Sequence, residues 1–231
     1  RLLAVSPHLA RLARDNRAFL DRAVGWVAAR GVRQFLDLGS GLPATANTHQ
    51  AAQAVAPDAR VVYVDRDAMV VVHSMALLTG DGSTAAVRAD ITRPRSVLGH
   101  PGVLEMIDFR QPVAVIAAMV LHFMDPGQAR DVMGTLAAAL APGSYLIVSV
   151  GCGDREVGGR LAREYAAGNL HNHAPDDIAS FFAGARLEPP GIVHAADWQP
   201  GAAVRRPALT GAHVLAGVGR LPGAATACQR K

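Results

Sequence analysis

Two hydrophobic patterns alternate along the chain, one typical of helices and the other of buried strands. Through residues 8–30, apolar positions recur at helical spacing, with arginines and aspartates between them. Further along, short uninterrupted apolar runs such as Val61–Val64 and Val113–Ala117 indicate strands that are buried on both faces. Because helical stretches separate these runs, the pattern predicts an α/β fold, in which helices cover both faces of a mostly parallel sheet.

Seven strands are expected, with helices between them. The strands cover Phe35–Leu38, Val61–Val64, Thr84–Arg88, Val113–Ala117, Ser144–Ser149, Gly191–Val193 and His213–Val218. The helices cover residues 8–30, 45–55, 67–78, 95–107, 126–140 and 176–182. Gly31 is expected to end the first helix.

Length and composition narrow the class of protein. With 231 residues, half of them hydrophobic, the chain is long enough for one large α/β domain with a substantial core. No apolar run is long enough to span a bilayer, and residues 1–30 lack the order of a signal peptide, so we expect a cytoplasmic protein. Arg1 cannot be a natural start, so some N-terminal sequence is expected to be missing.

Charge and cysteine usage argue against several partners. The net charge of +4 comes almost wholly from scattered arginines without interleaved aromatics, so no nucleic-acid partner is expected. Cys152 and Cys228 lie far apart and are expected to be free thiols in a reducing compartment. His171 and His173 have no acid or cysteine at ligand spacing, so a plain polar loop is favoured there over a metal site.

The most informative residues lie at the end of the first expected strand. Asp37 is followed two residues later by a turn of the form Gly-x-Gly, made by Gly39 and Gly41. The bare backbone of such a turn lets a nucleotide-like ligand lie against the chain. A carboxylate before the glycines would repel a pyrophosphate, but it could bind a ligand that carries an ammonium and a sulfonium. Asp37 therefore favours S-adenosylmethionine over NAD.

Further acids follow the second and third expected strands. Asp65 can accept both hydroxyls of a ribose, a role shared by both cofactor classes, or it could be a solvated loop acid. Asp90 can accept from an adenine amino group while Ile91 packs on the ring face, although Asp90 could instead cap a helix. Because parallel strands end at one edge of a sheet, we expect Asp37, Asp65 and Asp90 to converge around one adenosine.

At these residues the chain resembles the class I S-adenosylmethionine-dependent methyltransferases. More closely, it is similar to the bacterial family known as S-adenosyl methyltransferase, formerly a domain of unknown function common in actinomycetes. The likeness covers nearly the whole chain and is carried by Asp15–Leu20, Gln34–Pro43, Ala54–Asp65, Leu121–Phe123, Pro142–Leu146 and Ala216–Arg220. It implies a Rossmann-like fold with a seven-stranded sheet whose last strand is antiparallel, with S-adenosyl-L-methionine as cofactor and S-adenosyl-L-homocysteine as product.

Two departures from the family pattern stand out. Members usually begin with a segment like Gly-Gly-Lys-Asp-Asn-Phe, which could cover the cofactor and is absent here. Ser40 and Ala44 stand where members tend to have threonine. With no repeat or linker in the sequence, we expect one domain over 1–231, composed of an N-terminal helical cap (1–30), a cofactor-binding half (31–150) and a substrate-side half with the closing strands (151–231).

Most of the expected cofactor contacts lie at strand ends. Arg17, on the leading helix, could pair with the cofactor's carboxylate in a bidentate way, or it could lie on the surface. Asn47 and His49, on the helix after the glycine turn, could face the site or the solvent. The expected cofactor-binding set is Arg17, Asp37, Gly39, Ser40, Gly41, Asp65, Arg66, Asp90, Ile91 and Met119.

Catalysis would rest mainly on proximity, because the cofactor itself carries the reactive carbon. A neutral hydroxyl or amine must also lose a proton, and His122, just past the fourth strand, is the candidate general base because imidazole titrates near neutral pH. The alternative is a histidine that only bonds a loop carbonyl. Met119 and Phe123 are expected as pocket walls, whereas Trp26 and Trp198 are expected to pack rather than to line a substrate pocket.

The sequence therefore predicts methyl transfer from S-adenosylmethionine to a small-molecule acceptor by in-line displacement, with no membrane partner. A homodimer is a further candidate assembly. Two alternatives stay open: a nicotinamide-dependent oxidoreductase that uses the same glycines, and a non-catalytic protein that binds S-adenosylmethionine. The methionines Met69, Met75, Met106 and Met133 are expected to fill the core.

Overall fold

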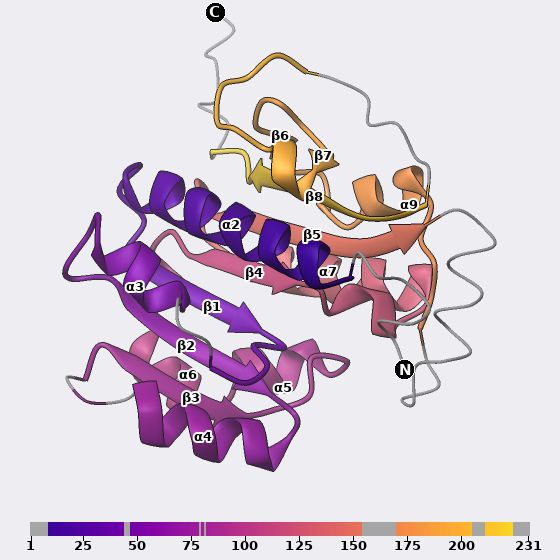
Figure 1. Cartoon of the computed structure of the whole chain (residues 1–231). Coiled ribbons are helices and arrows are strands. Elements are labelled where there is room, and N and C mark those ends of the chain that lie inside the picture. Colours follow the sequence, from indigo (N-terminus) through magenta and orange to yellow (C-terminus); the bar gives the residue numbers. More distant parts are fainter. Residues whose placement is uncertain are drawn as a thin grey trace, which may run out of the picture.

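The computed structural model describes residues 9–43, 47–78, 80, 82–153, 170–204 and 211–223. Three positions discussed above, Arg1, Ala44 and Cys228, lie outside these ranges, as do residues 45 and 46 of an expected helix. Within them the chain forms one mixed sheet with helices on both faces (Figure 1). The fold class predicted from the alternating patterns is confirmed.

Five strands of the sheet are parallel. They lie side by side in the order β3 (Thr84–Arg88), β2 (Arg60–Asp65), β1 (Gln34–Leu38), β4 (Ala114–Ala118) and β5 (Tyr145–Gly153). The strand order reverses between β1 and β4, and in open α/β sheets ligands bind beyond the strand ends at this switch point.

The other strands of the sheet are antiparallel. β8 (Ala212–Arg220) runs against β5 along its whole length, from Tyr145 opposite Arg220 to Gly153 opposite Ala212. Two short strands, β6 (Arg186–Leu187) and β7 (Val193–His194), pair with β8. Over the described residues the sheet thus has eight strands, one more than expected, because a two-residue strand such as β6 carries no hydrophobic period.

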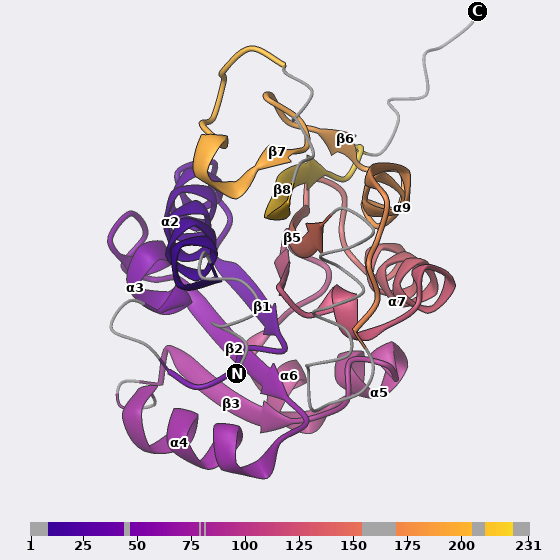
Figure 2. The ribbon, with the colours of Figure 1, turned by 45° about the vertical axis from the view of Figure 1, so that its right-hand side comes forward.

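Helices form a layer on each face of the sheet (Figures 1 and 2). One layer contains α2 (Leu9–Ala28), α3 (Thr48–Gln53) and α4 (Ala68–Leu78). The other contains α5 (Pro94–Leu98), α6 (Pro101–Met106), α7 (Pro126–Ala138) and α9 (Pro175–Ser180). The helical stretch expected over 95–107 is broken because Pro101 starts a new helix, whose cap is the His100 side chain accepting from the Gly102 amide at 3.1 Å.

Alternation along β1 decides which way its acid points. Leu36 and Leu38 belong to the core cluster on the α5–α7 face, whereas Phe35 belongs to the cluster under α2 and α3. Successive side chains of a strand point to opposite faces, so Asp37 shares the face of Phe35. The carboxylate of Asp37 is therefore directed toward α2 and α3.

The leading helix α2 packs on one face of the sheet as part of a helical layer. Phe19 is fully buried and meets Trp198 edge to face, with ring centroids 5.4 Å apart. The Arg22 guanidinium donates to the backbone oxygens of Trp198 and Ala195, the latter in the short helix η2 (Ala195–Asp197). Trp26 in turn meets Trp198 edge to face, so the expectation that both tryptophans serve packing is confirmed.

The methionines divide between core and surface. Met133 is fully buried and Met106 packs against the core, as expected. The prediction is wrong for Met69 and Met75, which are 61% and 54% exposed on α4. α4 is apolar nearly all round, so its sequence gives no sign of which face is buried. No described helix is both long and apolar enough to cross a membrane.

Candidate functional site

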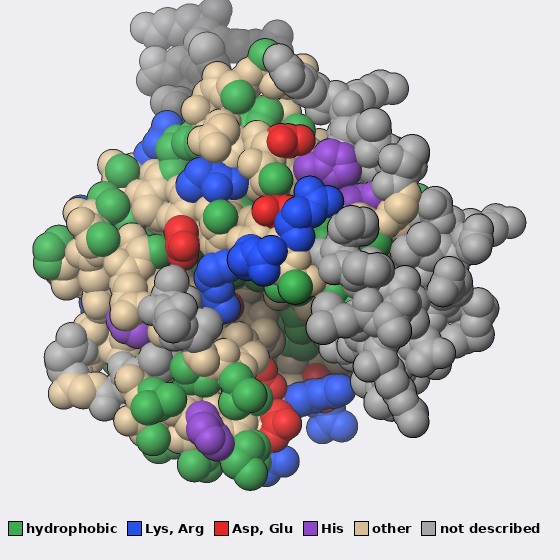
Figure 3. All heavy atoms as spheres, viewed as in Figure 1, with side chains coloured by type: hydrophobic (Ala, Val, Ile, Leu, Met, Phe, Trp, Pro, Cys, Tyr) green, Lys and Arg blue, Asp and Glu red, His purple; other side chains and the backbone are tan. Residues whose placement is uncertain are grey.

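A cavity of about 500 Å³ opens where β1, β2 and β4 end, and we call it the polar cavity. Figure 3 shows this face hollowed at its centre, with basic side chains above the hollow and both acidic and basic side chains below it. Every residue expected to hold the cofactor lines this cavity: Arg17, Asp37, Gly39, Ser40, Gly41, Asp65, Arg66, Asp90, Ile91 and Met119. The structure thus brings together residues that are about a hundred positions apart in the sequence, such as Arg17 and Met119.

The glycine turn gives the cavity a bare backbone. Gly39 and Gly41 both have φ of +65°, a conformation that L side chains rarely adopt. A Cβ on Gly39 would lie 2.4 Å from Cγ2 of Val120, so no side chain fits there. The amides of Gly39 and Ser40 donate to the Val64 oxygen at 2.8 and 3.2 Å, which ties the turn to the end of β2.

Asp65 holds this turn from the neighbouring strand. Its Oδ2 accepts from the Gly41 amide at 3.0 Å, and its Oδ1 accepts from the Asp67 amide at 3.0 Å. Each carboxylate oxygen can accept more than one hydrogen bond, so both oxygens can also receive a ligand hydroxyl. The carboxylate is therefore fixed in position before any ligand arrives, and it is not a solvated loop acid.

Asp90 forms a local turn rather than a helix cap. Its Oδ1 accepts from both the amide and the hydroxyl of Thr92, at 2.9 and 2.8 Å. The helix that follows begins at Pro94 with Arg93 as its N-cap, so the capping alternative for Asp90 is wrong. Both bonds to Thr92 use Oδ1, and Asp90 lines the cavity, so its second oxygen can accept from a ligand.

Asp37 is the most strongly perturbed carboxyl group at the cavity. It is 8% exposed, and its Oδ2 accepts from the Thr48 hydroxyl at 2.6 Å. Burial raises the pKa of Asp37 to about 6, and Asp65 adds to the rise, whereas Thr48 and the positive charge of Arg17 act in the opposite direction. A cationic group bound beside Asp37 would favour its ionised form.

Two further polar groups complete the donor set. The hydroxyl of Ser40 is buried and has no hydrogen-bond partner among the described residues, which is a position that a ligand can satisfy. Asn16 also lines the cavity, and its Oδ1 accepts from the Ser149 hydroxyl at 2.6 Å. Carboxylates, the guanidinium groups of Arg17 and Arg66 and a bare turn together fit a ligand that combines an ammonium, a carboxylate, a diol and a flat ring.

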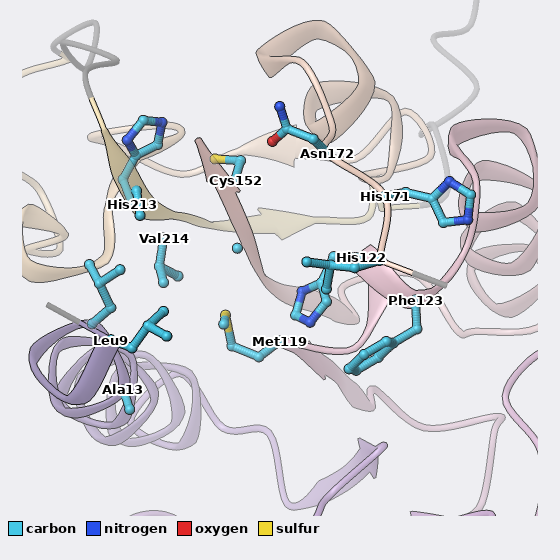
Figure 4. Close-up of a pocket in the computed structure, with 14 residues that line it drawn as sticks. Leu9, Ala13, Met119, His122, Phe123, Cys152, His171, Asn172, His213 and Val214 are labelled. Carbon is cyan, nitrogen blue, oxygen red and sulfur yellow. The ribbon is translucent and has the colours of Figure 1, made fainter. Parts of the chain in front are cut away.

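A second cavity of about 250 Å³ lies beside the first, and we call it the apolar cavity (Figure 4). It shares Met119 and Phe123 with the polar cavity. Its other walls come from the first turns of α2, the segment after β4, the end of β5, the segment before α9 and the start of β8: Leu9, Leu12, Ala13, His122, Gly151, Cys152, Leu170, His171, Asn172, Ala212, His213 and Val214.

Met119 stands between the two cavities. It has φ of +54°, in the left-handed region that non-glycine residues rarely enter. Its amide donates to the Ser149 oxygen at 2.9 Å, which holds this conformation at the end of β4. Such backbone strain is found preferentially at functional sites. The interpretation of Met119 as a pocket wall is confirmed, and the residue serves both pockets.

His122 lies in the short helix η1 (Leu121–Phe123), with its ring between Met119 and Phe123 (Figure 4). It is 5% exposed, and its Nδ1 has no hydrogen-bond partner among the described residues. Burial lowers the pKa of His122 to about 4, and the charge of His173 contributes in the same direction. The expectation that this imidazole titrates near neutral pH is therefore wrong: it is uncharged at pH 7.

Other polar candidates have structural partners. His49 does not line either cavity, and its Nδ1 lies 2.8 Å from the Tyr63 hydroxyl. Asn47 is buried at the N-cap of α3. Asn172 is paired with both the amide and the oxygen of Gly153, each at 2.9 Å. Within the described part of the chain, no group of three histidine, cysteine or acidic residues could hold a metal ion.

Fold and site together define a class. A parallel sheet closed by an antiparallel strand, with an acid and a glycine turn at its switch point, is the architecture of a Rossmann-like methyltransferase. The chain belongs to the S-adenosyl methyltransferase family, whose sequence profile matches residues 1–222. Its cofactor is accordingly S-adenosylmethionine, which decides between the two cofactor classes that the glycine turn left open.

Solved structures agree with this assignment. A candidate methyltransferase from Thermobifida fusca YX is 39% identical, with a TM-score of 0.84 over 96% of this chain and 86% of that one. A DUF574 family protein from Streptomyces avermitilis MA-4680 is 36% identical, with a TM-score of 0.82 over 96% of this chain and 88% of that one.

A more distant likeness concerns the fold alone. The N-methyltransferase NodS from Bradyrhizobium japonicum WM9, crystallised with S-adenosyl-L-homocysteine, is 14% identical, with a TM-score of 0.52 over 87% of this chain and 85% of that one. No protein of curated function matches the chain.

Proposed function

We propose that this protein is an active enzyme that transfers the methyl group of S-adenosylmethionine to a small molecule bound in the apolar cavity. The observation that carries the proposal is the shared wall: Met119 and Phe123 line both cavities, so a ligand in one lies next to a ligand in the other. Placing two reactants side by side in fixed orientation supplies most of the rate enhancement in a displacement of this kind.

The polar cavity would hold the cofactor by its charged and polar ends. Asp37 would face the ammonium, and Arg17, whose charge already acts on Asp37, would pair with the carboxylate. Asp65 would accept from the ribose hydroxyls with the oxygens that fix the glycine turn. Asp90 and Ile91 would receive the adenine amino group and ring face.

When bound, S-adenosylmethionine supplies a methyl group on a positively charged sulfur, and the carbon–sulfur bond breaks with its electron pair remaining on sulfur. His122 would accept the proton that the acceptor loses, because its imidazole is unprotonated at neutral pH and its Nδ1 has no partner among the described residues. An imidazole of low pKa is a weak base, so orientation would contribute more to the rate than proton transfer.

Titration calorimetry with S-adenosylhomocysteine tests the cofactor assignment. The wild-type protein should bind it, and Asp65→Ala should weaken binding by about a hundredfold through loss of the ribose contact and the turn. Asp58→Ala is the matched control, because Asp58 is an exposed acid paired with Arg33 at 3.0 Å, outside both cavities. Equal affinity of the two variants would contradict the placement of the ribose.

A second measurement separates an enzyme from a protein that only binds the cofactor. Incubation with S-adenosylmethionine carrying a labelled methyl group and a mixture of small hydroxylated and amino compounds should yield a labelled product. If the protein binds S-adenosylhomocysteine but no compound becomes labelled, the non-catalytic alternative is favoured.

A further inference from the structure

The apolar cavity also indicates what kind of molecule is methylated. Resting on the function proposed above, we infer that the acceptor is a small, uncharged and largely apolar molecule that presents a weakly acidic hydroxyl of the phenol type to His122. The inference follows from the charge, the size and the hydrogen-bonding capacity of the cavity.

The first argument is charge. Within the described part of the chain, no residue that lines the apolar cavity is an aspartate, glutamate, lysine or arginine. The polar cavity next to it, by contrast, is lined by three aspartates and two arginines. A charged group moved from water into surroundings without a counter-charge loses its hydration without compensation. Acceptors that carry a carboxylate or an ammonium group should therefore bind this cavity more weakly than neutral acceptors.

Two titratable side chains that line the apolar cavity, Cys152 and His122, are also uncharged at neutral pH. Burial raises the pKa of Cys152 to about 12, so its thiol is uncharged at neutral pH. His122 is uncharged as well. Figure 4 shows the rings of His171 and His213 turned away from the centre, while the His122 ring lies between Met119 and Phe123. The wall of the cavity thus offers a neutral imidazole beside apolar side chains.

The second argument is size and shape. Pockets for drug-sized ligands span about 300–1,000 Å³, so a volume of about 250 Å³ suits a molecule of one or two rings. Leu9 and Leu12 from α2 and Val214 from β8 supply aliphatic walls, and Phe123 supplies an aromatic one. Flat apolar rings pack well against such surfaces.

The third argument is the proton. Nδ1 of His122 is buried without a partner in the described structure, and in the tautomer protonated on Nε2 it can accept one hydrogen bond. A phenol is neutral and can donate that bond, whereas an aliphatic amine arrives as a cation and a carboxylate has no proton to give. An aliphatic alcohol is too weak an acid for so weak a base.

The transfer balances with these groups alone. The hydroxyl oxygen forms a bond to the methyl carbon, the carbon–sulfur bond breaks with its electrons on sulfur, and the hydroxyl proton passes to His122. The products are a methyl ether, S-adenosylhomocysteine and an imidazolium, which returns its proton to water.

Calorimetric titration of protein saturated with S-adenosylhomocysteine tests the inference with four probes of one shape. These are p-ethylphenol, p-ethylanisole, p-ethylbenzoate and p-ethylbenzylamine, which differ in charge and in the presence of a donor. We expect p-ethylphenol to bind about tenfold more tightly than the benzoate or the benzylamine, and about threefold more tightly than the anisole.

Two variants locate the effect. His122→Ala should abolish the difference in affinity between p-ethylphenol and p-ethylanisole. The weaker binding of the charged benzoate and benzylamine should remain. His73→Ala is the matched control, because His73 is an exposed histidine on α4 that lines neither cavity, and it should keep both differences.

Three results would overturn the inference. The first is binding of the benzoate or the benzylamine as tight as that of the phenol. The second is failure of p-ethylphenol to bind protein that is saturated with S-adenosylhomocysteine. Failure of the folded protein to take up S-adenosylhomocysteine at all would overturn the proposed function, and this inference with it.

Discussion

The two cavities meet at Met119 and are built on opposite principles. The polar cavity is made of backbone turns and carboxylates at the ends of parallel strands, with hydrogen bonds already formed around Asp65 and Asp90. The apolar cavity is made of side chains from elements far apart in the chain, with a neutral imidazole in its wall. A site for an invariable ligand can be fixed by the fold itself, whereas a site for a variable ligand depends on side chains.

The largest expected effect breaks the polar cavity alone. In Gly39→Ala the new Cβ would meet Val120 at 2.4 Å and the residue would keep a positive φ, so the turn must move. We expect affinity for S-adenosylhomocysteine to fall by about a thousandfold, as measured by calorimetry. Gly31→Ala is the control: Gly31 has φ of +91°, nothing lies within 4 Å of its Cβ position, and it lines neither cavity.

That control separates strain from function. Gly31→Ala should cost about 1 kcal/mol of folding free energy and leave cofactor affinity unchanged. If Gly39→Ala bound S-adenosylhomocysteine as the wild type does, the glycine turn would not be part of the cofactor site.

The next effect concerns the imidazole of the apolar cavity. His122→Ala should lower kcat by about a hundredfold at saturating cofactor, because the acceptor loses its proton partner, while affinity for S-adenosylhomocysteine stays unchanged. Since the pKa of His122 is lowered to about 4, wild-type kcat should stay level as the pH falls from 8 to 5. A fall in kcat with a midpoint near 6.5, the ordinary value for histidine, would contradict the buried, uncharged state.

Asp37→Asn should separate stability from binding in the polar cavity. Burial raises the pKa of Asp37 from 3.8 to about 6, so the folded protein holds this proton more tightly than the unfolded chain does. Stability from this group is therefore greatest below pH 3.8 and is lost as the pH rises through about 6, on the order of 3 kcal/mol in total.

Urea denaturation of cofactor-free protein at pH 5 and pH 8 measures this term. Asp37→Asn should be more stable than the wild type at pH 8 and should bind S-adenosylmethionine about thirtyfold more weakly, because it lacks the charge that faces the ammonium. Asp58→Asn, which alters an exposed acid, should change neither quantity. The His122 contribution has the opposite pH dependence, so the informative quantity is the stability difference between the wild type and Asp37→Asn. If that difference were the same at pH 5 and pH 8, the raised pKa of the buried Asp37 carboxyl would be contradicted.

The smallest expected effect tests whether the two cavities can be altered independently. A Cβ on Gly151 would lie 3.2 Å from Cε of Met119 and 3.6 Å from Nδ1 of His122, so Gly151→Ala would crowd the apolar cavity. We expect acceptor KM to rise about tenfold with cofactor affinity unchanged. Gly134→Ala, on α7 with nothing within 4 Å, should leave both parameters at wild-type values. A loss of cofactor affinity in Gly151→Ala would mean that the two cavities are not separable.

How far the sequence predicts this molecule differs between the same two regions. Asp65, Asp90 and the glycines follow recognisable strands, and the geometry of a parallel sheet requires such positions to meet at one edge. Their placement in one cavity could therefore be predicted from the chain alone. The structure adds the bond from Gly41 to Asp65, which no residue pattern indicates.

The apolar cavity was largely beyond prediction. Leu9, Cys152 and Val214 are of residue types that are also common in protein cores. No hydrophobic period or motif distinguishes a side chain that lines a cavity from one that fills the core. His122 could be singled out by its place after the fourth strand, but its pKa depends on burial by distant elements. The prediction that Met69 and Met75 fill the core was wrong because α4 is apolar nearly all round. The sequence of such a helix does not indicate which face is buried.

The helix α2 contributes side chains to both cavities. It supplies Leu9 and Leu12 to one cavity and Asn16 and Arg17 to the other, and Asn16 is bonded to Ser149 of β5. A ligand that settles this helix in place spares the next ligand the same ordering cost. If the bound cofactor strengthens acceptor binding by a given factor, thermodynamic reciprocity requires the bound acceptor to strengthen cofactor binding by the same factor.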